Sequence, residues 1–194
     1  FFLRSLKARK PVVMKIAIVS GSARPARQSH YVALEIMKRL EQLDEVEPML
    51  LDPRERPLPV LEYIYARHPS PTPAMIWWKE KIDAADAYLW VTPEHNSSFS
   101  GAIKNALDYF YEEYAGKPMG IVAVSSGAMG GINAVHALQP VCLRIGGILM
   151  PNFMITPKVK TLFDETGRLT DEAYAQRLEK FLHQFVQFSK KHSK

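Results

Sequence analysis

Short runs of apolar residues alternate with amphipathic segments along most of this chain. Five runs have the length and composition of buried strands, and they cover residues 15–19 (KIAIV), 46–52 (VEPMLLD), 87–91 (AYLWV), 120–124 (GIVAV) and 147–151 (GILMP). Elsewhere apolar residues recur every three or four positions, which predicts helices. These helices are expected near residues 28–43, 74–85, 101–114, 131–145 (interrupted near Pro140) and 174–188.

This order of elements predicts the fold class. Strands that alternate with helices favour right-handed crossovers and an α/β fold, with helices on both faces of a parallel sheet. Five strands fit the flavodoxin-like order 2-1-3-4-5, a three-layer sandwich whose second strand, which contains Pro48, lies at an edge. Ligands bind such sheets beyond the carboxyl ends of the strands, near the switch point between strands 1 and 3. The loops after strands 1, 3 and 4 are therefore expected to form the site.

Length and composition narrow the class further. The chain has 194 residues, 47% of them hydrophobic, which suits one domain over residues 14–194. No run is long enough to span a membrane. The single cysteine, Cys142, excludes an intramolecular disulfide framework and favours a reducing, cytoplasmic location. Residues 1–13 (FFLRSLKARKPVV) lack a secretory apolar core and cleavage site, so they are expected to be an extension outside the fold.

The net charge of +5 would attract anionic ligands. It is a poor signal for nucleic acid, because no basic patch is interleaved with aromatic residues in the way that single-strand binders require. We expect no nucleic-acid partner.

The loop after the first strand carries the chemistry of an anion site. Residues 19–29 (VSGSARPARQS) combine small, hydroxyl-bearing and cationic residues just before a helix, whose N-terminal N–H groups bind anions. The candidate phosphate ligands are Ser22, Arg24, Arg27, Gln28 and Ser29. A solvated helix cap is the alternative. Because neither G-x-G-x-x-G nor G-x-x-x-x-G-K-[ST] is present, the phosphate is not expected to belong to a standard dinucleotide or triphosphate site.

The other two loops favour a flat heterocycle. The loop after the third strand contains Pro93, Glu94, His95, Asn96, Ser97 and Ser98, and the loop after the fourth, residues 125–131 (SSGAMGG), contains Ser125, Gly127 and Gly130. No G-x-S-x-G nucleophile elbow occurs, and adjacent Glu94 and His95 do not suit a metal. Three glycines allow close approach of the backbone to a ligand.

Three segments of the chain together resemble the NADPH-dependent FMN reductase family, which includes quinone, chromate and azo reductases: GSARPARQS, PEHNSSFSGAIKNALDYFYEE and SSGAMGG. The resemblance implies FMN as cofactor, with its phosphate on Ser22, Arg24 and Ser29, near Arg27 and Gln28. It implies that residues 93–96 line the ring edge, that Ser97 and Ser98 lie beside the ribityl chain or phosphate, and that Ser125, Gly127 and Gly130 contact the ring.

The resemblance also implies the activity. Hydride would pass from NADPH, or NADH, through FMN to a small-molecule acceptor such as a quinone, flavin, azo compound or chromate, with no dedicated catalytic residue and no metal. A homodimer or homotetramer is expected, with the aromatic residues of 101–114 at the interface. A flavodoxin-like electron carrier is the alternative, although carriers are usually acidic. His95, Ser97 and Ser100 depart from the usual family residues at their positions, which bears on acceptor specificity.

Overall fold

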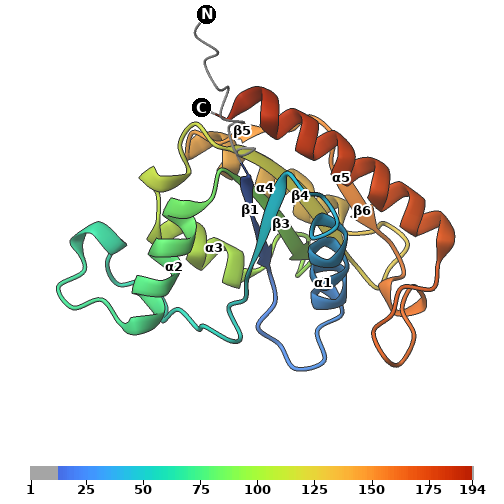
Figure 1. The fold of residues 1–194 in the computed structure, drawn as a ribbon. Coiled ribbons are helices and arrows are strands. Elements are labelled where there is room, and N and C mark those ends of the chain that lie inside the picture. The colour runs from blue at the N-terminus through green and yellow to red at the C-terminus, as the bar shows by residue number, and fades with distance from the viewer. Residues whose placement is uncertain (1–12, 194) are drawn as a thin grey trace, which may run out of the picture.

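The sheet has the expected parallel order. The computed structural model describes residues 13–193, so the extension expected at residues 1–13 lies outside the described residues except for Val13. The strands run in the order β2-β1-β3-β4-β5, and β6 also pairs with β4, which confirms the flavodoxin-like α/β class (Figure 1). The strands are β1 (Met14–Ser20), β2 (Val46–Leu51), β3 (Ala87–Pro93), β4 (Pro118–Val124), β5 (Ile148–Leu149) and β6 (Met154–Thr156).

Two short strands share the fifth position of the sheet. β5 pairs with the start of β4, where Pro118 is opposite Ile148, and β6 pairs with its end, where Val122 is opposite Met154. Pro151 between them has no N–H to donate to a ladder, so the chain bends outward there before it rejoins β4. The strand expected over residues 147–151 is therefore shorter than predicted, and the three-residue β6 was not predicted.

The helices form the two outer layers. α1 (Gln28–Leu40) and α5 (Glu172–His192) cover one face, and α2 (Pro73–Ala84), α3 (Gly101–Tyr109) and α4 (Ile132–Arg144) cover the other (Figure 1). Alternate residues of each strand supply the two cores: Ile16 and Ile18 pack towards α1 and α5, whereas Ala17 and Val19 pack on the opposite side. Both faces are apolar, so polar groups are concentrated at the strand ends.

The aromatic residues around α3 belong to the core. Tyr109, Phe110 and Tyr114 are buried, and the Tyr114 hydroxyl donates to the Ala106 carbonyl at 3.1 Å. Only Tyr111 of this group is exposed, by 44%. The helix ends at Tyr109 and a short 3-10 helix over Glu112–Tyr114 follows, which turns Tyr114 back into the core. These side chains therefore do not support the expected subunit interface.

Pro140 does not interrupt α4, contrary to the prediction, because the helix continues to Arg144. A proline inside a helix removes one hydrogen bond to the carbonyl four residues earlier, here that of His136. Both residues lie on the exposed side of α4, where water can bond that carbonyl, so the helix tolerates the proline.

Candidate functional site

The first loop leaves the sheet through a narrow gap between β3 and α3. The Gly21 N–H donates to the Val91 carbonyl at 2.8 Å, and a Cβ at Gly21 would lie 2.6 Å from that same oxygen. Only glycine fits this close approach. Ser22 follows and is buried, so the loop begins inside the protein and not on its surface.

The loop then turns into α1 with a buried hydroxyl group that lacks a partner. Ala26 has a φ of +51°, an unfavourable value for a residue with a side chain. Ser29, in the first turn of α1, is 3% exposed, and its Oγ makes no hydrogen bond with any described residue. Since a buried hydroxyl without a partner is costly, Ser29 fits a site whose ligand supplies the missing partner.

The two arginines of the loop have different environments. Arg27 forms a two-pronged ion pair with Asp52, with Nη1–Oδ1 and Nη2–Oδ2 distances of 2.5 Å. Arg24 is exposed and forms no salt bridge with any other residue in the range 13–193. Burial alone would raise the pKa of Asp52, but hydrogen bonds from Arg27 and from the Arg54 N–H outweigh it and hold this pKa below its usual value.

The loop after β3 folds back as a tight turn. The His95 N–H donates to the Ser98 carbonyl at 2.9 Å, and the Ser98 N–H donates to the His95 carbonyl at 3.0 Å. Asn96 and Ser97 between them both have positive φ, +49° and +60°, which is the geometry of a type I′ turn. Ser100 then caps α3 by accepting a hydrogen bond from the Ile103 N–H at 3.2 Å. The turn fixes His95 beside the first loop.

Glu94 connects this loop to α4. Its Oε2 accepts from the Asn133 backbone N–H at 3.2 Å and its Oε1 from Asn133 Nδ2 at 3.1 Å. A carboxylate is favoured at a helix N-terminus, so this side chain holds the loops after β3 and β4 together. The Glu94 N–H donates to the Val124 carbonyl at 3.1 Å, which adds a main-chain bond between the same two segments.

The loop after β4 is bonded to a segment about thirty residues further along the chain. The Ser125 N–H donates to the Thr156 carbonyl at 3.0 Å, and the Val159 N–H donates to the Ser125 carbonyl at 3.1 Å. Gly130, with a φ of +64°, packs so closely on Ile155 and Pro157 that a Cβ would come within 3.0 Å of each. These contacts bring Val159 and Lys160 to the carboxyl edge of the sheet.

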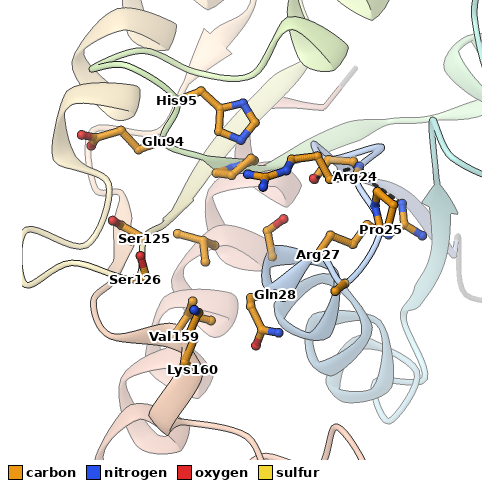
Figure 2. A pocket seen from close by; sticks show the side chains of 15 residues that line it. Arg24, Pro25, Arg27, Gln28, Glu94, His95, Ser125, Ser126, Val159 and Lys160 are labelled. Atoms are coloured by element: carbon orange, nitrogen blue, oxygen red, sulfur yellow. Dashed lines mark hydrogen bonds between the residues drawn. The ribbon is translucent and has the colours of Figure 1, made fainter.

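The three loops and this segment enclose one cavity of about 430 Å³, a size typical of small-ligand sites. Figure 2 shows Ser125 and Ser126 across the opening from Arg24 and Pro25, with Val159 and Lys160 below. Of the residues predicted from the sequence, the lining includes Ser22, Arg24, Arg27, Gln28, Ser29, Pro93, Glu94, His95 and Ser125. The predicted residues Asn96, Ser97, Ser98, Gly127 and Gly130 shape the surrounding loops without lining it.

The sequence analysis did not predict every lining or supporting residue: Pro25, Ala26, Val124, Ser126, Val159, Lys160 and Asp52 were missed. Ser126 directly follows the predicted Ser125, so the motif already contained that signal. Val159 and Lys160 follow the unpredicted β6, and no pattern in the sequence pointed to them. Asp52 directly follows β2, outside the three loops expected to form the site.

Residues 14–161 match the sequence model of the family described as "NADPH-dependent FMN reductase". A "Quinone reductase" of Pseudomonas putida is 33% identical over 92% of this chain and 96% of its own. An "NAD(P)H:quinone oxidoreductase" of Solanum tuberosum is 31% identical over 88% and 90%.

Among solved structures, the flavoenzyme NAD(P)H:(acceptor) oxidoreductase FerB of Paracoccus denitrificans superposes with a TM-score of 0.79. It is 29% identical, and the match covers 94% of this chain and 100% of that one.

In residues 13–193, no group of three or more His, Cys, Asp or Glu side chains is placed to hold a metal ion. No helix in that range is long and apolar enough to cross a membrane.

Proposed function

The chain belongs to the NADPH-dependent FMN reductase family, and on this premise we propose that the cavity beyond β1, β3 and β4 is its FMN site. The activity is that of a flavin-dependent NAD(P)H oxidoreductase. The proposal concerns which residues hold the cofactor and what each of them does.

The unpartnered Ser29 hydroxyl carries this proposal. It is buried in the first turn of α1, lines the cavity, and is close in sequence to Arg24, which is exposed and forms no salt bridge within residues 13–193. A phosphate would accept hydrogen bonds from this hydroxyl, from the N–H groups of the first turn and from Arg24. Ser22 and Gln28 complete the phosphate end, and Lys160 adds a second cation from the opposite wall.

The ring end is proposed to be the side formed by Pro93, Glu94, His95 and Ser125, with Ser126 beside them. Asn96, Ser97 and Ser98 set the turn that presents His95, and Gly127 and Gly130 set the course of the facing loop. Bound FMN supplies hydride transfer between a nicotinamide and an acceptor. The chain's own residues bind and orient it, so no general base is needed and none is proposed.

The acceptor is proposed to be a small molecule such as a quinone or an azo compound, in keeping with the names of the relatives.

We propose a single domain over residues 14–194, which the shared sheet between the two cores supports. A cytoplasmic location is supported by the single buried thiol. A homo-oligomer is supported by exposed apolar side chains, Val60 by 85% and Tyr63 by 51%, and light scattering on the purified protein tests it.

The decisive experiment loads the purified protein with FMN, removes free flavin, and records the visible spectrum before and after anaerobic addition of NADPH. Retained flavin that bleaches supports the proposal. Retained flavin that stays oxidised with both NADPH and NADH indicates the electron-carrier alternative. Failure to retain flavin, with the protein folded, contradicts the assignment of the cavity.

A further inference from the structure

We propose that Asp52, which does not line the cavity, is a positioning residue for the phosphate end of the site and acts by holding Arg27 across the first loop. In this arrangement Arg24 is the arginine that contacts the phosphate, and Arg27 shapes the loop. The inference rests on the proposed FMN site and deepens it.

Parallel pairing places Asp52 behind the first loop. Val19 of β1 is opposite Leu51 of β2, so the residues that follow them leave the sheet side by side. Asp52 is 4% exposed and is bonded by the two Arg27 nitrogens and, at 2.9 Å, by the Arg54 N–H. A carboxylate held from several directions is a rigid support, because neither of its oxygens is free to turn towards water.

Arg27 uses this support to close the loop. Besides its bonds to Asp52, its Nη1 donates to the Ser22 carbonyl at 2.7 Å. Residues 22 and 27 are thereby joined at the base of the loop, and the peptide plane after Ser22 is fixed because peptide groups are planar. Because the Ser22 carbonyl oxygen accepts this bond from a cation, its partial negative charge repels a nearby anion less.

The pair also explains how the loop keeps a strained shape. Ala26, directly before Arg27, has a φ of +51°, and such residues persist only where neighbouring contacts hold them. Arg27 and its partner supply that contact, with side chains only 9% and 6% exposed. Their opposite charges cancel, so the net attraction for an anion comes from Arg24 and from Lys160.

The competing role for Arg27 is direct contact with the phosphate. This role predicts the opposite effect on FMN affinity when Asp52 is removed. If Arg27 bound the phosphate, the Asp52 carboxylate would compete for it, and its removal would leave FMN affinity unchanged or raise it. If Arg27 shapes the loop, removal of Asp52 weakens phosphate binding. The sign of the change separates the two roles.

The test compares FMN with riboflavin, which lacks the phosphate. Dissociation constants for both are measured by quenching of flavin fluorescence in the wild type, Asp52→Asn, Arg27→Lys and Arg24→Gln. Asp83→Asn is the matched control, since Asp83 pairs with Lys79 at 2.5 Å at the far end of α2. We expect Asp52→Asn to raise the FMN constant about tenfold or more and to change the riboflavin constant less than about twofold.

Each result of these titrations either supports or overturns the role inferred for Asp52. An FMN constant in Asp52→Asn that is unchanged or lower overturns the inference, as does an equal loss for riboflavin, which would indicate a general structural defect. If Asp52→Asn does not fold, Arg27→Lys decides, because lysine keeps the charge but cannot bond both Asp52 oxygens and the Ser22 carbonyl. Retained FMN affinity in Arg27→Lys contradicts the role. A wild type that binds neither flavin contradicts the proposed function instead.

Discussion

The gap through which the first loop leaves the sheet can be tested by adding one methyl group. In Gly21→Ala the new Cβ would lie 2.6 Å from the Val91 carbonyl oxygen and 2.6 Å from Ile103 Cδ1, well inside the 3.4 Å at which ordinary contact begins. The terminal methyl of Ile103 can rotate away. The Val91 oxygen belongs to the middle strand of the sheet and cannot, so β1 and β3 must separate at this point.

The loss of stability expected for Gly21→Ala comes from two effects of that separation. Overpacking of a core costs about 1–3 kcal/mol, and lengthening the Gly21–Val91 hydrogen bond costs about 1 kcal/mol more. We therefore expect the free energy of unfolding to fall by about 3 kcal/mol. For a chain of this length that corresponds to a decrease in Tm of about 6–12 °C.

Gly101→Ala provides the matched control. A Cβ at Gly101, in the first turn of α3, meets no atom within 4 Å, and alanine is favoured over glycine in a helix by up to about 1 kcal/mol. Urea denaturation and thermal melts of both variants, without flavin, measure the difference. If the free energy of unfolding of Gly21→Ala lies within about 0.5 kcal/mol of that of Gly101→Ala, the close approach of Gly21 to the Val91 carbonyl does not constrain the loop.

Three further tests address the phosphate end of the site, the turn after β3 and the core. Ser29→Ala removes a buried hydroxyl that has no hydrogen-bond partner among residues 13–193. Urea denaturation should therefore show unchanged or higher stability without flavin, and titration should show FMN affinity lower by about tenfold. Unchanged affinity would contradict its role at the phosphate. Ser97→Gly relieves a φ of +60° and should raise the free energy of unfolding by about 1 kcal/mol. A smaller increase is expected for Asn96→Gly, because asparagine tolerates this conformation. A lower free energy of unfolding in Ser97→Gly would refute the reasoning. Burial raises the pKa of the Cys142 thiol to about 12, so an alkylating reagent at pH 8 should modify it only as the protein unfolds. Rapid labelling of the native protein would contradict the burial of Cys142 in the core.

The strand order and the anion loop were predictable because both depend on local patterns. Buried parallel strands give continuous apolar runs, and a small, cationic segment such as residues 21–29 directly before a helix is recognisable in any sequence. Nine of the predicted site residues line the cavity, five of them from this segment and four from the loops after β3 and β4.

The remaining features depend on contacts between distant segments. The sequence does not show that Arg27 is paired with Asp52, because this pair forms only when β1 and β2 lie side by side. Similarly, the three residues of β6 carry no periodicity of their own, so the position of Lys160 at the cavity could not be anticipated. The aromatic residues of 101–114 suggest a subunit interface from the sequence, because composition alone does not reveal that a 3-10 helix turns Tyr114 inward.

The hydrogen bonds between residues 125–130 and 156–159 mean that the cavity is complete only after the chain beyond β5 has been synthesised. A nascent chain that has emerged only as far as β5 contains every predicted motif, yet the second half of β4 still has an unpaired edge, which favours aggregation. The wall formed by Val159 and Lys160 is also missing at that stage. α5 is missing as well, and its apolar side chains fill the core on one face of the sheet. With the cavity as the proposed FMN site, flavin colour in a cell extract would therefore report chains completed through α5, and not the total amount translated.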